Sequence, residues 1–367
     1  MNKFITLGCV IASSVLGLAG ASCAGGSDDG ACRVHINPDE STSIPLDENR
    51  LVRLETSDSS LIYSVEYMVV AGDKFVIKSS NLLKSFNAAD GSFAGVFARQ
   101  GQGPGEFSMI TRLWADGDSV KLYDTNSRRV SVYLRDGSFV RSLDFVPEGK
   151  ADHPLALVSF LELPDSSGYL GFNSYMGGTA KTNPQYSFID KNLRFLSDVP
   201  GREMQTGGFA NDLGYTDVAS GRLLTWETLR DTVFSVTPQG VDAAYIFDYG
   251  DYAVPARIQA LPERIERVMA FREAREKGDR LASVASFIQR GADGNYWFTF
   301  TTTDGLWHLA RFAPEGGNAE VFDFDFGQRD YALAPFILAD GDDLITVFTD
   351  KSDPEANPMI YRHPLAK

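Results

Sequence analysis

The sequence contains little cysteine and histidine, and this shortage excludes one class of protein. Its 367 residues include three cysteines and four histidines. No cysteine–histidine cluster has the spacing of zinc ligands, so a zinc-stabilised domain is excluded. Cys9 and Cys23 fall in the N-terminal export region, so Cys32 is expected to stand alone, with a Cys23–Cys32 disulfide as the alternative.

Basic residues are outnumbered by acidic ones. The chain has 34 lysines and arginines against 49 aspartates and glutamates, a net charge of −15. Loss of residues 1–22, whose only charge is Lys3, changes this to −16. Nucleic acid and anionic lipid surfaces are bound through basic patches, so neither is expected as a partner.

Long apolar runs are absent outside the N-terminus. Residues 1–3 form a short basic region, residues 4–18 an apolar stretch too short to span a bilayer, and residues 19–22 a run of small residues before Cys23. This order resembles a bacterial lipoprotein signal over residues 1–22, with Cys23 as the acylated residue. Gly20 departs from the pattern, because such signals usually carry leucine three places before the cysteine.

A polar tether follows over residues 23–33. Within it, Ser27, Asp28 and Asp29 resemble the acidic export signal of surface-displayed lipoproteins of Bacteroidota, and an ordinary solvated linker is the alternative. We therefore expect an outer-membrane lipoprotein exposed at the cell surface, with the periplasmic face as the alternative. Contact with the membrane is expected only through the Cys23 lipid.

The body of the chain repeats itself. Gly72-Asp73 recurs as Gly117-Asp118, and the Asp-Gly-Ser-Phe of residues 90–93 recurs at 136–139, offsets of 45 and 46 residues. A period of this length, with strand patterns between Asp-Gly turns, is typical of four-stranded propeller blades. The sequence therefore predicts an all-β fold over residues 34–367, a six-bladed β-propeller of four-stranded blades.

The last predicted blade is incomplete. It begins near Phe336, and too little chain remains for a full set of strands. Residues 34–37 and 51–54 have strand character and no partner nearby in the sequence. We expect them to pair in the last blade and close the ring, which removes an exposed sheet edge.

One segment, at about residues 254–281, breaks the strand pattern between the fourth and fifth blades. Apolar residues recur there at steps of three and four, which predicts an amphipathic helix. The expected apolar stripe consists of Ile258, Leu261, Ile265, Val268, Met269 and Ala274. A cap packed on the propeller is favoured, and a partner-docking helix or a substrate lid is the alternative.

Two motifs carry a family resemblance. Residues 99–107 resemble the G-x-G-P-G-E-F turn between the first blades of six-bladed β-propeller lipoproteins of Bacteroidota, relatives of the NHL-repeat proteins. Residues 230–236, with 247–250 and Pro255, look like that family's N-D-T-I-Y-x-I hairpin and the segment after it. The resemblance implies a fold and a surface location, but no reaction.

The glycine-rich part of the first motif does not suit a phosphate. Pro104 removes a backbone donor, Glu106 repels an anion, and Phe107 leads into a strand where a phosphate loop would lead into a helix. A tight connection between blades is the better interpretation. Arg99 and Glu106 are expected to pair across this loop or to face the central channel.

Catalytic motifs are scarce. No Gly-x-Ser-x-Gly elbow is present, and most aspartates sit at turn positions, where the side chain bonds nearby backbone. A lactonase-like metal site would draw a glutamate, an asparagine and an aspartate from separate blades. The sequence offers Glu66, Asn173, Asp217 and Glu227 for it. No metal or other cofactor is predicted, although calcium held by oxygen ligands in the channel is conceivable.

Binding is therefore favoured over catalysis. Aromatic rings beside carboxylates and amides are typical of sugar and peptide sites, while burial between blades is the alternative for each tryptophan. The predicted function is a binding module for an extracellular glycan or peptide, with an envelope protein as a further candidate partner. The alternative is a metal-dependent hydrolase or lyase. The predicted ligand-binding residues are Trp226, Glu227, Arg230, Arg99, Glu106 and Trp114.

Overall fold

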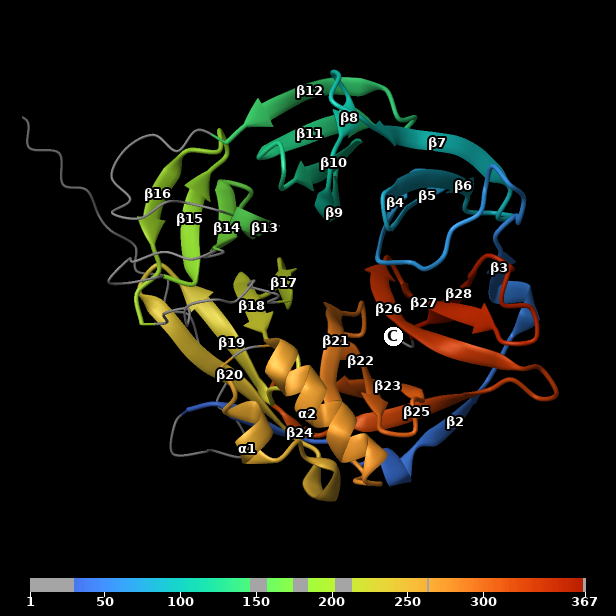
Figure 1. Cartoon of the computed structure of the whole chain (residues 1–367), viewed down its shortest axis with the longest axis vertical. Coiled ribbons are helices and arrows are strands. Elements are labelled where there is room, and N and C mark those ends of the chain that lie inside the picture. Colours follow the sequence, from blue (N-terminus) through green and yellow to red (C-terminus); the bar gives the residue numbers. More distant parts are fainter. Residues whose placement is uncertain (1–29, 146–156, 174–183, 202–212, 263, 366–367) are drawn as a thin grey trace, which may run out of the picture.

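The computed structural model describes residues 30–145, 157–173, 184–201, 213–262 and 264–365. Their strands form six sheets, which stand around a central axis (Figure 1). The prediction of an all-β propeller is confirmed. The predicted signal region and nearly all of the tether lie outside the described residues.

The first three sheets follow the chain in simple order. The first contains β4 (Tyr67–Ala71), β5 (Lys74–Ser79), β6 (Leu82–Asn87), β7 (Phe93–Gln100) and β8 (Glu106–Phe107). The second contains β9 (Ile110–Asp116), β10 (Ser119–Asp124), β11 (Arg129–Leu134) and β12 (Phe139–Asp144). The third contains β13 (Leu157–Glu162), β14 (Gly168–Asn173), β15 (Tyr186–Asp190) and β16 (Phe195–Asp198).

The other three sheets each include a strand from the N-terminal segment. The fourth contains β17 (Leu213–Asp217), β18 (Arg222–Trp226), β19 (Thr232–Thr237), β20 (Gly240–Asp248), β1 (Cys32–His35) and β24 (Gly317–Asn318). The fifth contains β21 (Ala282–Arg290), β22 (Tyr296–Thr302), β23 (Trp307–Phe312), β25 (Glu320–Asp325) and β2 (Thr42–Pro45). The sixth contains β26 (Tyr331–Asp340), β27 (Asp343–Asp350), β28 (Met359–Pro364) and β3 (Leu51–Arg53).

Burial along the strands reflects this packing. Middle strands such as β14 are buried at every position, because neighbouring sheets cover both faces, whereas outer strands such as β12 are mostly exposed. The predicted hairpin turns are present, and Gly72 and Gly117 adopt φ angles of 67° and 55°. Glycine reaches this left-handed region at little cost, so these short local signals mark the turns reliably.

The N-terminal segment completes the propeller in a way that was only partly predicted. β3 pairs antiparallel with β28, so the last sheet receives its fourth strand as expected. The expected pairing of residues 34–37 in the same sheet is wrong, because Val34 in β1 pairs parallel with Phe247 of β20. β2 pairs parallel with β25. The segment therefore covers the outer edges of three successive sheets, which leaves fewer open backbone groups.

Short helices accompany the strands. Two 3-10 turns, η1 (Pro38–Glu40) and η2 (Glu48–Arg50), interrupt the N-terminal segment. Between β20 and β21 lie η3 (Gly250–Tyr252), α1 (Ala256–Gln259) and α2 (Arg264–Glu276), at the position of the predicted helical insertion. Within the described residues, no helix has the length and apolar character needed to cross a membrane.

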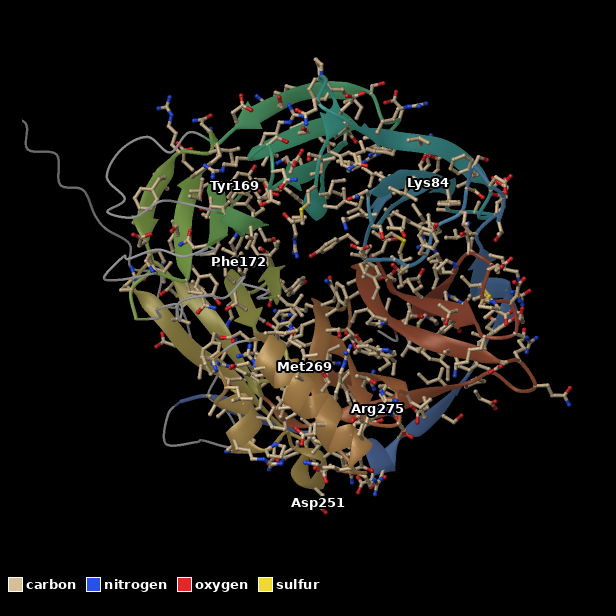
Figure 2. All side chains as sticks on the ribbon, viewed as in Figure 1. Lys84, Tyr169, Phe172, Asp251, Met269 and Arg275 are labelled. Atoms are coloured by element: carbon tan, nitrogen blue, oxygen red, sulfur yellow. The ribbon has the colours of Figure 1, made fainter. Side chains whose placement is uncertain are left out.

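The predicted apolar stripe of the helical insertion is wrong in part. Ile258 and Ala274 are buried, but Ile265 and Met269 are 66% and 57% exposed; Met269 is labelled on α2 in Figure 2. The buried face instead includes Arg267, which is 3% exposed. A charged residue can occupy that face because its guanidinium is hydrogen-bonded on several sides there.

Cys32, at the start of β1, is disulfide-bonded. The prediction that it stands alone is therefore wrong. The other cysteines, Cys9 and Cys23, lie outside the described residues. The alternative pairing of Cys32 with Cys23 competes directly with acylation, because both would use the Cys23 sulfur.

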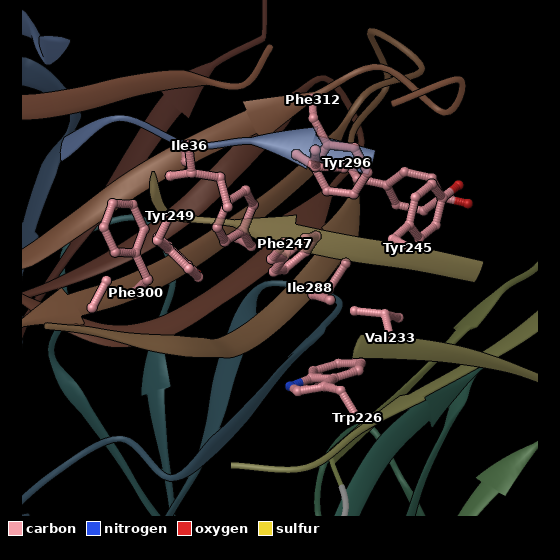
Figure 3. Close-up of a cluster of buried hydrophobic side chains, with 14 of the residues drawn as sticks. Ile36, Trp226, Val233, Tyr245, Phe247, Tyr249, Ile288, Tyr296, Phe300 and Phe312 are labelled. Carbon is pink, nitrogen blue, oxygen red and sulfur yellow. The ribbon is translucent and has the colours of Figure 1, made fainter. Parts of the chain in front are cut away.

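The core lies between neighbouring sheets. The cluster between the fourth and fifth sheets is rich in aromatic residues, and Phe247 stacks on Phe298 with ring centroids 4.9 Å apart. Trp226, at the end of β18, belongs to the same cluster (Figure 3). Similar apolar clusters hold the other sheets together, so the sheets present their innermost strands to the channel in fixed positions.

Candidate binding site in the central channel

A cavity of about 920 Å³ occupies the central channel. Its walls come from the innermost strand of every sheet, β4, β9, β13, β17, β21 and β26, with turns that follow several of them and Trp226 at the end of β18. None of its lining residues belongs to α1 or α2. The helical insertion is thus not part of the cavity wall, and its apolar cluster with Leu229, Val254 and Leu281 packs it against the loop after β18 and the segments that lead into and out of the helices.

Aromatic side chains from every sheet line the cavity. Tyr67 comes from β4, Trp114 from β9 and Tyr215 from β17. Phe287 and Phe336, whose rings meet edge to face with centroids 5.0 Å apart, add an apolar wall from β21 and β26. Rings mixed with polar groups are what a small-molecule or sugar site requires.

Trp114 faces the cavity because successive side chains of β9 point to opposite faces of the strand. Leu113 is buried in the cluster between the first and second sheets, so its neighbours Arg112 and Trp114 fall on the opposite side of the strand. The Trp114 Nε1 donates to Glu162 Oε2 at 3.1 Å, and Lys121 Nζ lies 3.2 Å from Glu162 Oε1. This carboxylate therefore fixes the orientation of the indole.

Asp217 ends β17 in a fully bonded environment. Its carboxylate accepts from Tyr296 Oη at 2.5 Å and lies 3.0 Å from Arg290 Nη1. Burial alone would raise the pKa of Asp217, but the hydrogen bonds from Ser220 and Tyr296 and the charge of Arg290 outweigh it and hold the pKa below the usual value. Asp217 is therefore ionised and engaged by protein groups.

Arg112 crosses the channel. It starts on β9, donates from Nη2 to the carbonyl of Gly214 on β17 at 3.2 Å, and lies over the Tyr67 ring of β4, 5.7 Å from its centroid. Three sheets thus meet at one guanidinium. Sequence reasoning missed this residue, and the only signal for it was its position two residues before Trp114 in the same strand.

The predicted residues Trp226, Glu227 and Arg230 lie mostly within the protein. Trp226 is 1% exposed and packs in the core, although it also borders the cavity. Glu227 Oε2 lies 3.2 Å from Arg230 Nε and 3.0 Å from Arg267 Nη2, so it joins the loop after β18 to α2. Neither Glu227 nor Arg230 lines the cavity.

Arg99 and Glu106 lie on the outer strands of the first sheet, and neither lines the cavity. Their backbones pair in parallel register. The Glu106 carboxylate turns into its own loop and accepts from the Gly103 N–H at 2.7 Å. A Cβ on Gly101 would collide with that carboxylate, so these glycines serve a tight structural turn. Of the six predicted binding residues, Trp114 is the one with a half-exposed side chain in the cavity wall.

The residues considered for a metal are dispersed. Glu66 pairs with Lys78, the buried Asn173 donates to the carbonyl of Pro184, and Asp217 and Glu227 pair with arginines. Within the described ranges, no group of three histidine, cysteine, aspartate or glutamate side chains is placed to hold a metal ion.

The fold and the cavity define the class: a β-propeller with an aromatic and polar cavity along its axis. The family is shown by a match over residues 39–271 to the model described as "Domain of unknown function (DUF4934)", and the chain belongs to that family. No curated protein matches the chain.

Solved structures share the fold. A Bacteroides fragilis protein classed as exported is similar with a TM-score of 0.65 and 15% identity, over 91% of this chain and all of the other. A member of the DUF4221 family from Bacteroides vulgatus has a TM-score of 0.53 and 10% identity, over 86% of this chain and 98% of the other. At these identities the likeness concerns the fold alone.

Proposed function

We propose that this protein is a binding module of the bacterial cell envelope, whose channel cavity holds part of an extracellular glycan or peptide. In this proposal the six sheets are six blades of one closed ring. The single observation that carries the binding function is the cavity of about 920 Å³, walled by all six sheets and lined by aromatic and polar side chains.

The location rests on the sequence. Residues 1–22 resemble a lipoprotein signal and Ser27-Asp28-Asp29 a surface-export signal, so we propose a protein of the outer membrane that faces outward. Its anchor is the Cys23 lipid, which requires that Cys23 is not the disulfide partner of Cys32 in the mature protein. The structurally similar Bacteroides fragilis protein is itself described as exported. The acidic net charge of −15 agrees with attachment through a lipid and not through a basic surface.

The binding function is tested by thermal shift on the purified full chain with panels of oligosaccharides and peptides, with and without EDTA. The expected result is stabilisation by one class of ligand, unaffected by EDTA and lost in Trp114→Ala. The matched control is Trp307→Ala, because Trp307 is a half-buried tryptophan that does not line the cavity. Each variant is compared with its own unliganded melting temperature.

Two outcomes would count against the proposal. Equal loss of the ligand response in both tryptophan variants would place the ligand outside the cavity. Stabilisation by a divalent metal that EDTA reverses, together with turnover of a lactone or ester, would establish the metal-dependent hydrolase or lyase instead.

A further inference from the structure

The charges that line the cavity are almost all neutralised within the protein. Glu162 Oε1 lies 3.2 Å from the Lys121 ammonium, and Asp217 pairs with Arg290 at 3.0 Å. Asp340 pairs at 3.0 Å with Arg362 of β28. Each of these carboxylates has a cation within direct contact. The lining therefore has little free negative charge, although the protein as a whole is strongly acidic.

Arg112 is the exception. Among the residues that the structure describes, no carboxylate lies within 4.0 Å of its guanidinium. Its polar contact is the Gly214 carbonyl, and its other neighbour is the Tyr67 ring. A guanidinium has five N–H donors. The Arg112 side chain is half-buried in the cavity wall, so most of its donors remain available to a ligand. A positive charge in such a place favours an anionic ligand, because the ligand supplies the missing counter-charge.

We propose that the channel cavity takes a sugar that bears a carboxylate, of the uronic-acid type, and that Arg112 binds this carboxylate. The inference rests on the proposed binding function. Arginine suits the role because its planar fork matches both oxygens of a carboxylate.

The rest of the lining favours a sugar over a peptide. Trp114 and Tyr67 provide ring surface on which the C–H face of a pyranose can pack, and the indole is held in place by its bond to Glu162. Ser286 and Gln289 line the same cavity, and neither side chain has a hydrogen-bond partner within the described part of the chain. They are available to ring hydroxyls.

A peptide would use the site differently. Peptides that add to a sheet need one long open strand edge. Here six inner strands meet around an axis, and each contributes a short segment to the wall. Such an arrangement surrounds a compact ligand better than it extends an existing sheet.

The test is isothermal titration of the full chain with three probes: a galacturonic acid trisaccharide, the corresponding neutral galactose trisaccharide and an acidic hexapeptide. The expected result is preference for the galacturonate, reduced roughly 10- to 100-fold in Arg112→Gln, as removal of hydrogen bonds to a charged group predicts. Arg112→Lys, which keeps the charge without the fork, should retain part of the affinity. Arg272→Gln, on the exposed face of α2, is the matched control and should bind as the wild type does.

The outcomes separate the two proposals. Equal binding of the neutral and acidic sugars, unchanged in Arg112→Gln, would overturn this inference and leave the binding function standing. Preference for the acidic peptide, lost in Arg112→Gln, would overturn the choice of a sugar. No binding of any probe or of the wider panel would overturn both. Should Arg112→Gln fail to fold, full affinity for galacturonate in the folded Arg112→Lys variant would refute the role of the bidentate fork.

Discussion

Replacement of Arg267 by methionine should detach α2 from the propeller. The Arg267 guanidinium donates to the carbonyls of Thr228, Leu261 and Pro262 at 3.3, 2.8 and 3.0 Å, and to Glu227 at 3.0 Å. Methionine keeps much of the aliphatic volume but removes all four bonds. The helix is therefore expected to lose its polar attachment while most of its apolar contacts persist.

The magnitude follows from these contacts. Removal of one partner from a buried ion pair destabilises by about 3–5 kcal/mol, and each buried acceptor left without a donor adds about 1–3 kcal/mol. Glu227 retains Arg230 at 3.2 Å, and Pro262 is exposed to water, so the lower figure of about 3 kcal/mol applies. Since about 1.4 kcal/mol corresponds to a factor of ten, the helix should open roughly 100-fold more often.

Hydrogen exchange measures this opening directly. Amides of α2 should lose about two orders of magnitude of protection in Arg267→Met, while amides of the middle strands β5 and β14 keep theirs, because the cap can open locally. Arg272→Met, an exposed change on the same helix, should alter protection by less than about threefold. Equal protection of α2 in the two variants would show that the buried guanidinium does not hold the cap. Ligand binding should persist in both, since α2 does not line the cavity.

Three further predictions concern other sites. Asp217→Asn should reduce the free energy of unfolding at pH 7 by about 2 kcal/mol. Folding lowers the pKa of Asp217, so the stability difference between wild type and variant should be full above the ordinary pKa of 3.8 and should disappear as the pH falls further. A stability difference that stays constant down to pH 2 in denaturant unfolding would contradict the pairing. Gly101→Ala should destabilise by only about 1 kcal/mol, because the added Cβ displaces the flexible end of the Glu106 side chain and breaks its bond from the Gly103 N–H. The loss should be smaller in a Glu106→Ala background, and additive losses would refute the collision. If Cys23 is acylated, mass spectrometry should find the lipid there and Cys23→Ala should leave the membrane fraction; a Cys23–Cys32 disulfide in the mature protein would exclude that anchor.

Local signals in the sequence were sufficient for the repeating architecture. Asp-Gly turns recur at offsets of 45 and 46 residues, and each specifies its hairpin through φ preferences and side-chain bonds within a few residues. Strands that are apolar at nearly every position, such as β14, need neighbouring sheets on both faces. The propeller class, the short connection at residues 99–107 and the helical insertion followed from these local properties.

The pairing partners of the N-terminal strands could not be predicted from local sequence. Strand character in residues 34–37 and 51–54 was evident, but a strand of a few residues can pair with any open edge. β3 meets β28 and β1 meets β20 because of where the segment runs around the outer rim. That route depends on the assembled ring and on no property of the strands themselves.

Which residues line the cavity likewise depends on the assembled fold. Trp114 and Trp226 were both predicted to bind ligand, yet Trp114 is half-buried in the cavity wall, whereas Trp226 is 1% exposed in the core and only borders the cavity. Arg112 carried no motif, and its importance arises because it reaches Gly214 and Tyr67 on two other sheets. The sequence by itself determined where the turns fall and which strand segments carry aromatic and charged side chains. The tertiary structure alone decided which of them face the axis and which charge there has no counter-charge among the described residues, because burial and pairing depend on residues that are distant in the chain.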